Sequence, residues 1–362
     1  MTVDCPAPRH EDELVLLGHG AGGRLTAELL DTLVLPSLNG QDGQSGPDGQ
    51  GGPDGQGGPD GPLEDAALLP GHPDLVISTD SFVVSPLFFP GGDIGSLAVH
   101  GTVNDLAMRG ARPLALSVAL IVEEGLPLSE LRSVLQSLGK AARDAGVPVV
   151  TGDTKVVGRG AADKVFINTT GVGRRHRSLR PSAALARPGD AILLSGPVGL
   201  HGTTVLSTRE GLGFDSDIVS DSRPLHRLVH ALAPLGEDVH TLRDPTRGGL
   251  AAALNEIARD ASVALEVEEG AVPVPAAVAS ACDLLGLDPL TVANEGCLVA
   301  FVSPTAADEA VRALRALPEG AGAVRIGEVL PDGPAGRVVL RTLVGARRVL
   351  DMPLGEQLPR IC

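Results

Sequence analysis

A chain of 362 residues is long enough for two domains with sizeable cores, and its 43% hydrophobic and 20% charged residues are typical of a soluble globular protein. The formal net charge of −16 argues against a nucleic-acid partner, because a phosphate backbone requires a basic surface, but it leaves a nucleotide site open. No apolar run is long enough to span a bilayer, and the acidic N-terminal segment lacks the apolar core of a secretory signal. We therefore expect a cytoplasmic protein without membrane contact.

Residues 40–62 form a glycine-rich, low-complexity segment, GQDGQSGPDGQGGPDGQGGPDGP. Such a composition cannot bury apolar surface, so we expect a disordered insertion in a surface loop. Glycine at every third position is also typical of collagen, but the triplets are few and no trimerisation signal flanks them. A tolerated insertion is the better interpretation.

Strands and helices alternate on both sides of the insertion, which predicts an α+β fold of two domains followed by a mobile tail. In the first half we expect strands over 75–84, 114–122, 147–154 and 164–173, and helices over 93–110 and 128–146. Asp93 is the expected N-cap of the first helix, and Gly110 and Gly146 are the expected stops. A basic stretch near 174–187 marks the boundary. The predicted units are an N-terminal domain over 1–173, a C-terminal α/β domain over 174–350 and a tail over 351–362.

The second half repeats the mixed pattern. We expect strands over 263–274, 323–330 and 336–344, helices over 247–261 and 305–317, and a strand that runs into a glycine loop over 190–199. The tail contains two prolines and no periodicity, which predicts an extended segment.

The four cysteines contain no C-x-x-C pair, which argues against a zinc site or a redox pair. Cys282 lies in an apolar helical stretch and Cys297 in an apolar strand, so both are expected in the core. Cys5 is expected to be a loose N-terminal thiol. Cys362 differs from these because it is the last residue of the sequence.

Three aspartates of the first half follow strands or open loops: Asp80, Asp105 and Asp153. Each alone is an ordinary turn or capping residue. Together, with Asn104 beside Asp105 and Lys155 near Asp153, they favour a site for Mg²⁺ and ATP, since Mg²⁺ is held by carboxylates and phosphate oxygens.

Two glycine-rich segments open helices, an arrangement that suits an anion. The first, over 16–30, is LLGHGAGGRLTAELL and fits neither the Rossmann nor the Walker A pattern. The second places Thr246 and Arg247 before Gly248 and Gly249, which leaves phosphate binding and an ordinary helix start equally open. Glu295 precedes an apolar strand and could serve as a general base, although its position alone favours a solvated loop residue.

Together the motifs LGHGAGG, STDSFVVSPLFFPGGDIGSLAVHGTVNDLAMRGARP, VVTGDTKVV, RDPTRGGLAAALNEIA, ANEG and PRIC resemble the HypE family of hydrogenase maturation factors. That family is part of the superfamily of aminoimidazole ribonucleotide synthetase and selenophosphate synthetase. The terminal PRIC distinguishes HypE-like chains from the synthetases. The motifs cover the whole chain except the insertion.

The resemblance implies an activity. A HypF-type carbamoyltransferase would load a carbamoyl group onto Cys362, and the carbamoyl oxygen would attack the γ-phosphate of ATP. Loss of phosphate would leave a thiocyanate, whose cyanide would pass to iron on a HypC–HypD complex. The implied protomer dimerises through its N-terminal domain.

The resemblance also assigns roles to the candidate residues. Cys362 would carry the substrate, Glu295 would be the base, and Lys155 would serve the nucleotide or the carbamoyl group. The implied nucleotide-binding set is Asp80, Asn104, Asp105, Asp153, Thr246, Arg247, Gly248 and Gly249, with Asp80, Asp105 and Asp153 as Mg²⁺ ligands.

Two other hypotheses share these features. A synthetase of the selenophosphate type would have the same carboxylates and glycine segments, and a cysteine near its N-terminus, which Cys5 matches without the usual glycine-rich context. A non-enzymatic nucleotide-binding scaffold would use the tail only to dock a partner.

Overall fold

The computed structural model describes residues 15–20, 22–38, 64–210, 218–353 and 360–362. The predicted disordered insertion and Cys5 lie outside these residues, as does part of the predicted tail. Within the described ranges, every helix is too short or too polar to cross a bilayer.

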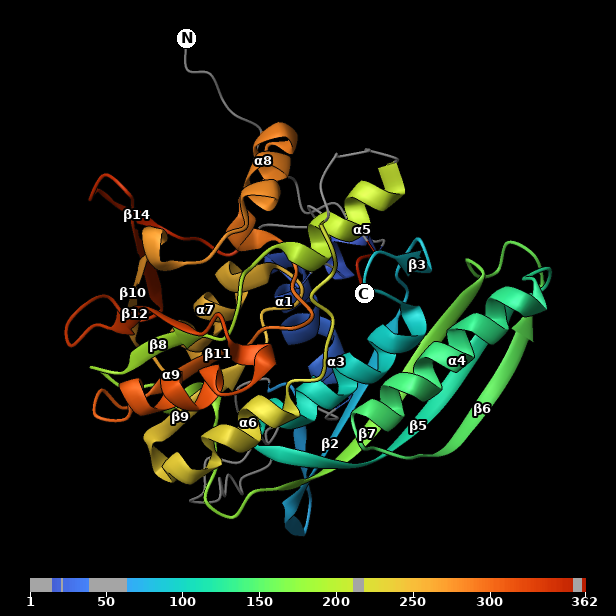
Figure 1. Cartoon of the computed structure of the whole chain (residues 1–362), viewed down its shortest axis with the longest axis horizontal. Coiled ribbons are helices and arrows are strands. Elements are labelled where there is room, and N and C mark those ends of the chain that lie inside the picture. Colours follow the sequence, from blue (N-terminus) through green and yellow to red (C-terminus); the bar gives the residue numbers. More distant parts are fainter. Residues whose placement is uncertain (1–14, 21, 39–63, 211–217, 354–359) are drawn as a thin grey trace.

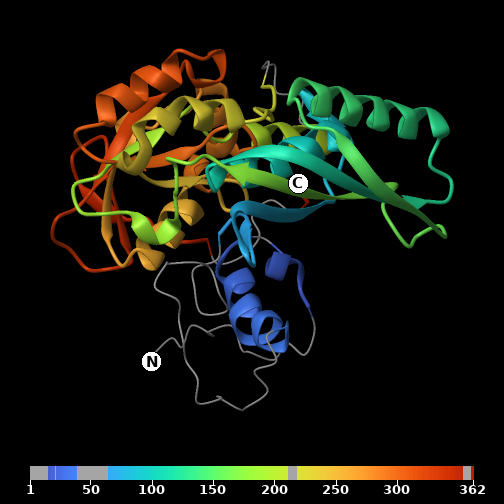
Figure 2. The ribbon, with the colours of Figure 1, turned by 90° about the horizontal axis from the view of Figure 1, so that it is seen from below.

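The N-terminal domain is built on a five-stranded sheet in the order β1-β2-β7-β5-β6, with helices on one face (Figure 1, Figure 2). Neighbouring strands are antiparallel except for β5 and β6, which run parallel. The strands are β1 (Ala67–Leu69), β2 (His72–Phe82), β5 (Ala111–Glu123), β6 (Val149–Val157) and β7 (Val165–Arg175). The helices are α3 (Ile94–Met108) and α4 (Leu128–Asp144), and a small hairpin pairs β3 (Phe88–Phe89) with β4 (Gly92–Asp93). A short helical segment over α1 (Arg24–Leu29) and α2 (Leu35–Leu38) lies beside the sheet.

Helix α3 begins and ends where the sequence predicts. The Asp93 carboxylate accepts hydrogen bonds from the backbone N–H groups of Gly95 and Ser96, and the Ser96 hydroxyl accepts one from the Asp93 N–H. Gly110 adopts a φ of 71° directly after the helix, a conformation that glycine reaches without strain. Because α3 lies between the sheet, α4 and the second domain, it is buried on nearly every side.

The C-terminal domain is a seven-stranded sheet in the order β14-β13-β10-β12-β8-β11-β9. Its strands are β8 (Ala191–Leu194), β9 (Val239–Arg243), β10 (Ala264–Glu268), β11 (Val299–Val302), β12 (Val324–Val329), β13 (Arg337–Arg341) and β14 (Arg347–Val349). Its helices are α5 (Leu200–Glu210), α6 (His226–Leu232), α7 (Gly249–Asp260), α8 (Ala276–Leu285) and α9 (Ala307–Arg315). Helix α7 packs against one face of the sheet, whereas α6 and α9 pack against the other.

Two details differ from the sequence-based expectations. The strand expected over 263–274 ends at Glu268, because a 3₁₀ turn over Glu269–Ala271 follows and Pro273 lacks an N–H for a ladder hydrogen bond. Cys297 is buried as expected, but it lies in the loop before β11 rather than in a strand.

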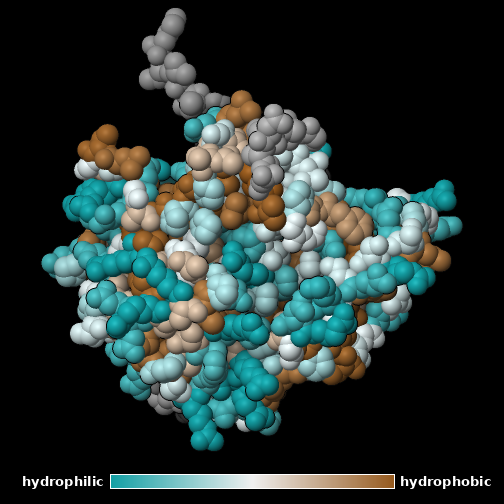
Figure 3. Space-filling model, in the orientation of Figure 1, coloured by the Kyte–Doolittle hydropathy of each residue, from teal (hydrophilic) through white to brown (hydrophobic). Residues whose placement is uncertain are grey.

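The two domains share a core at their junction. Ala107 and Met108, at the end of α3, belong to the same apolar cluster as Leu228 of α6 and Leu193 of β8. This packing fixes the polar residues on the last turns of α3 against loops of the second domain. Elsewhere the surface is mixed, with apolar side chains gathered over α8 on the face shown in Figure 3.

Candidate active site

A cavity of about 300 Å³ lies between the two domains. Both glycine-rich segments contribute to its wall, together with the middle of β2, one face of α3 and the loop after β9. Predicted site residues in its lining are Asp80, Asp105, Thr246, Arg247, Gly249, Glu295 and Cys362. Residues that were not predicted also line it, including Asp65 and Asp244.

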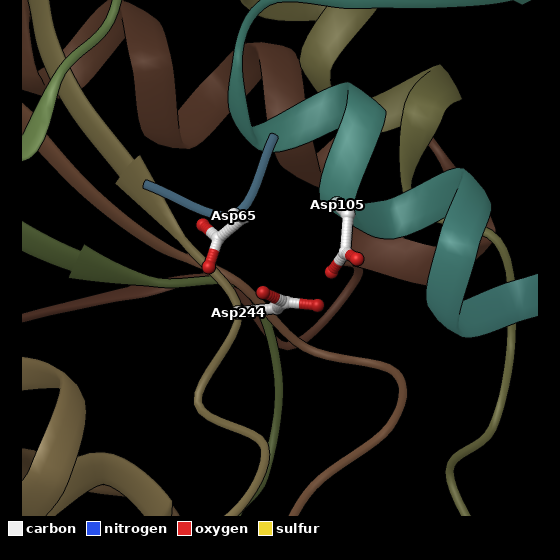
Figure 4. A group of neighbouring side chains, drawn as sticks. All are labelled: Asp65, Asp105 and Asp244. Carbon is white, nitrogen blue, oxygen red and sulfur yellow. The ribbon is translucent and has the colours of Figure 1, made fainter. Parts of the chain in front are cut away.

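Three aspartates of the cavity lining converge on one another, as Figure 4 shows. Asp65 precedes β1, Asp105 lies on α3 and Asp244 follows β9, and one carboxylate oxygen from each lies within 4.8 Å of the others. The Ser78 hydroxyl donates a 2.6 Å hydrogen bond to Asp105. Asp65 Oδ2 and Asp244 Oδ2 are buried and have no hydrogen-bond partner. Buried acceptors without a donor are costly, and a cation would satisfy them.

The raised pKa values of the three carboxyl groups also favour a bound cation. Burial is the largest cause that raises the pKa of each carboxyl, and the neighbouring carboxylates add to it. The pKa of Asp65 and that of Asp105 lie well above the usual value, and that of Asp244 rises to about 6. Arg243 partly offsets the charge through its 3.1 Å contact with Asp65. A hard divalent cation fits this set of oxygen ligands.

Cys362 reaches the cavity from the apolar core of the N-terminal domain, and only 7% of it is exposed. Arg247 Nη1 donates a 3.5 Å hydrogen bond to its Sγ atom. Burial raises the pKa of the thiol to about 12, against the opposing charge of Arg247. The thiol is therefore protonated and neutral in this position at physiological pH.

Glu295 is 3% exposed and also lines the cavity, so the structure excludes the solvated-loop interpretation. Its backbone N–H donates a 3.1 Å hydrogen bond to Asp221 Oδ1, and its carbonyl accepts one of 3.2 Å from the Arg223 N–H. Burial, followed by the charges of Asp244 and Asp80, raises the pKa of its carboxyl well above the usual value.

The two glycine-rich segments touch. Gly248 and Gly249 have φ values of 74° and 62°, and α7 begins at Gly249. A Cβ atom on Gly22 would lie 2.5 Å from the Cβ of Arg247, and one on Gly248 would lie 3.2 Å from the Gly22 carbonyl oxygen. Gly249 lines the cavity, whereas Gly248 lies behind it as the N-cap of α7. Glycine is thus needed for the close approach of the two segments.

Asp80 occupies a central place in the cavity wall. A Cβ atom on Gly101 of α3 would lie 3.7 Å from its Oδ2 atom and 2.8 Å from the Phe82 ring, so α3 approaches β2 closely at this point. Burial raises the pKa of Asp80, and the charge of Arg247 opposes that rise.

Besides Gly248, three predicted residues do not line the cavity. Asn104 is 1% exposed, and its amide donates to the Arg223 carbonyl at 3.2 Å and accepts from the Leu225 N–H at 2.8 Å. Its polar atoms thus hold a loop of the second domain, an arrangement that does not support nucleotide binding. Asp153 and Lys155 lie on the exposed face of β6, where they form a 2.9 Å ion pair with each other.

Comparison of the chain with known proteins identifies its family. Residues 63–175 match the AIR synthase related protein, N-terminal domain, and residues 187–339 match the corresponding C-terminal domain. The carbamoyl dehydratase HypE of Cupriavidus necator is 51% identical over 346 residues, which are 96% of this chain and 94% of that protein. The chain belongs to the carbamoyl dehydratase HypE family. The predicted two-domain α+β fold and the predicted family are confirmed, and the synthetase and scaffold hypotheses are set aside.

Solved structures of HypE proteins have the same fold. A hydrogenase maturation protein HypE in complex with ATP aligns with a TM-score of 0.77 and 49% identity over 96% of this chain and 100% of that one. A HypE–HypF complex aligns with a TM-score of 0.77 and 46% identity over 80% of this chain and 93% of the matched chain.

Proposed function

We propose that this chain uses ATP to dehydrate a carbamoyl group carried on Cys362. The product is a thiocyanate on the same sulfur, and its cyanide supplies the iron of a [NiFe]-hydrogenase active site. One observation carries the proposal: Cys362 Sγ lies in the same cavity as the aspartate cluster and Glu295, next to Arg247. An acceptor sulfur, a candidate cation site and a buried carboxyl thus line one cavity.

The reaction needs activation of a poor leaving group. The carbamoyl oxygen attacks the γ-phosphorus of ATP, the bond to ADP breaks, and the carbon now carries a phosphoryl oxygen that can leave. The nitrogen loses its two protons, the C–O bond breaks, and phosphate departs as the C≡N bond forms. Phosphoryl transfer of this kind depends on positioning and on electrostatic stabilisation more than on covalent help from the protein.

Asp65, Asp105 and Asp244 would hold Mg²⁺, with Asp80 beside them in the wall. The ion would neutralise phosphate charge at the point where the nucleotide enters. The glycine-rich segments that meet at Gly22 and Gly248 would hold phosphate oxygens, as segments that open helices do elsewhere.

Glu295 is suited to take a proton from the carbamoyl nitrogen. A general base works best when its pKa lies near the working pH, and burial raises the pKa of Glu295 in that direction. Arg247 opposes this rise and therefore favours the ionised, proton-accepting form.

The edge of the N-terminal sheet supports a homodimer. Strand β6 is an edge strand, and Val150 and Val156 on it are 64% and 70% exposed. An exposed apolar edge invites pairing with another copy. In such a dimer Asp153 and Lys155 would lie on the strand at the interface, where Lys155 could serve the nucleotide or the carbamoyl group. The proposed partners are a HypF-type carbamoyltransferase and a HypC–HypD complex, in the cytoplasm.

Intact-protein mass spectrometry tests the reaction. The chain is incubated with Mg²⁺, ATP, carbamoyl phosphate and a HypF-type partner, and the C-terminal peptide is then mapped. We expect a gain of one carbamoyl group on Cys362, followed by an ATP-dependent loss of one water. Cys362→Ala is the control that gains nothing. A carbamoylated Cys362 that keeps its water while ATP is hydrolysed would contradict the proposal.

A further inference from the structure

The last three residues are held by main-chain hydrogen bonds to the segment that follows β2. The Val83 N–H donates a 3.0 Å hydrogen bond to the Cys362 carbonyl oxygen, and the Ser85 N–H donates one of 3.2 Å to the Arg360 carbonyl oxygen. These two hydrogen bonds pair the tail antiparallel with residues 83–85, just beyond the end of β2 at Phe82. Main-chain hydrogen bonds of this kind give affinity, but they do not select a sequence.

Helix α5 of the second domain contacts two of these residues, and the C-terminus lies near it in Figure 1. His201 Nε2 lies 2.9 Å from the Ile361 carbonyl oxygen, and Arg209 Nη2 donates a 2.7 Å hydrogen bond to that of Arg360. Arg209 Nε also donates to the Ser85 carbonyl at 2.8 Å, so this one side chain ties the tail to the segment it pairs with.

The hydrogen bonds of His201 fix its protonation. A carbonyl oxygen can only accept, so Nε2 carries the proton, and Nδ1 then accepts from the Ser220 hydroxyl at 2.7 Å. The ring is fully buried, and burial lowers the pKa of His201 to about 4. His201 is therefore a neutral donor aimed at the tail at physiological pH.

Arg360 supplies the sequence-specific part of the contact. Its Nη1 atom lies 2.6 Å from Asp163 Oδ2, and its Nε donates a 3.0 Å hydrogen bond to the Val83 carbonyl. Its guanidinium carbon lies 5.9 Å from the centroid of the Phe166 ring. Directed hydrogen bonds from two guanidinium nitrogens to separate acceptors, together with a ring contact, are features in which arginine differs from lysine.

We propose that His201, Arg209 and Asp163 form a tail clasp that holds residues 360–362 and positions Cys362 in the cavity. They are positioning residues, because none of them lines the cavity. The clasp sets the fraction of time that Cys362 spends beside Arg247, and it opposes transfer of the sulfur to any external partner. The kinetic consequence rests on the proposed function, whereas the docking equilibrium does not.

Thiol alkylation of the full chain measures the docking equilibrium directly. A buried thiol reacts through its undocked fraction, so the rate for Cys362, followed by mass spectrometry of the C-terminal peptide, reports clasp strength. We expect Arg209→Ala and Asp163→Asn each to raise this rate by roughly 3- to 10-fold, the equivalent of one net hydrogen bond. His201→Ala should do the same, and His201→Gln, which keeps an N–H donor, should raise the rate less.

Asp144→Asn is the matched control, since Asp144 is also an exposed carboxylate with one cationic partner, Lys140. Its alkylation rate should equal that of the unaltered chain. A charge swap adds a second test: Asp163→Lys combined with Arg360→Glu should react more slowly than either single variant. Rates that stay unchanged in the three clasp variants, or rise equally in Asp144→Asn, would overturn the clasp.

The two half-reactions separate positioning from a general loss of structure. With the carbamoyl group already on Cys362, Asp163→Asn should slow its dehydration in a single turnover by at most roughly 3- to 10-fold, the full shift of the docking equilibrium, and by less the more the docked state predominates. Carbamoyl loading by a HypF-type partner should be as fast as before or faster. If Asp163→Asn slows loading and dehydration equally, the role of Asp163 is merely structural. If the unaltered chain makes no thiocyanate while the alkylation rates shift as expected, the proposed function fails and the clasp stands.

Discussion

Removing one charge from the aspartate cluster should stabilise the protein and abolish its use of Mg²⁺. The substitution is Asp244→Asn, which keeps the shape of the side chain. Asp244 Oδ2 accepts no hydrogen bond, so the amide replaces an oxygen that contributes no stabilising contact within the chain. The neighbouring carboxylates also lose a negative charge that raises their pKa values.

The magnitude follows from the pKa of Asp244, which rises from 3.8 to about 6 in the buried cluster. At about 1.4 kcal/mol per pKa unit, the ionised carboxylate costs the folded state about 3 kcal/mol. A raised carboxyl pKa means that the folded state holds its proton more tightly than the unfolded state. The stability that this tighter proton binding contributes is fully present below about pH 4 and is lost as the pH rises through about 6.

Thermal unfolding without metal at pH 5 and pH 8 is the assay. For a chain of 362 residues, about 1–3 kcal/mol corresponds to a rise in Tm of roughly 1–4 °C. We expect Asp244→Asn to show the full rise at pH 8 and about half of it at pH 5, where the carboxyl is protonated in the folded chain but ionised in the unfolded one. The variant should also lose the rise in Tm that Mg²⁺ gives the unaltered chain.

Asp190→Asn is the control, because the Asp190 carboxylate is also buried but is hydrogen-bonded within the chain. Its Oδ2 accepts from the Arg187 N–H at 2.8 Å and lies 2.7 Å from His240 Nδ1. This variant should lose stability at both pH values. The reasoning is refuted if Asp244→Asn lowers Tm at pH 8, or if Mg²⁺ stabilises that variant as it does the unaltered chain.

Three further predictions concern the base, the sulfur and the insertion. Glu295→Gln should accept the carbamoyl group normally but dehydrate it roughly 10²- to 10⁴-fold more slowly, and the rise of the single-turnover rate with pH should disappear; an unchanged rate would remove Glu295 from this role. Cys362→Ala should abolish thiocyanate formation while Tm and Mg-ATP binding persist, and a tag added after Cys362 should cripple dehydration because that residue is buried; full activity of the tagged chain would contradict the docked position. Deletion of residues 40–62 should leave dehydration intact, and loss of folding would show that the segment is structural.

Local sequence signals predicted the elements well where one residue decides a boundary. The cap at Asp93 and the stop at Gly110 depend on backbone geometry that only a few residue types supply, so α3 was placed within two residues. The strand that ends at Glu268 was predicted less well. Apolar alternation continues beyond it, but a 3₁₀ turn and Pro273 end the strand.

The site was harder to predict, because it is assembled from segments that are distant in sequence. Asp65 lies in no motif, and only the placement of β1 beside β2 brings it to Asp105. Asn104 adjoins Asp105, but successive helix residues point in different directions. Asp105 therefore faces the cavity, whereas Asn104 faces the loop of the second domain. Adjacency in a motif does not predict a shared role on a helix.

The environment of Cys362 argues that carbamoyl loading and dehydration take place at two different locations. With a pKa of about 12, the docked thiol is ionised in about one molecule in 10⁵ at pH 7, so it is a poor nucleophile there. Carbamoyl loading must then occur where the sulfur is solvated or lies beside a partner's own groups. The same apolar surroundings suit the later step, because a thiocarbamate and a thiocyanate carry no charge on sulfur. Burial of the sulfur also limits the attack of water on the O-phosphorylated thiocarbamate. The burial that hinders loading therefore favours dehydration, and a segment that can be held and released reconciles the two.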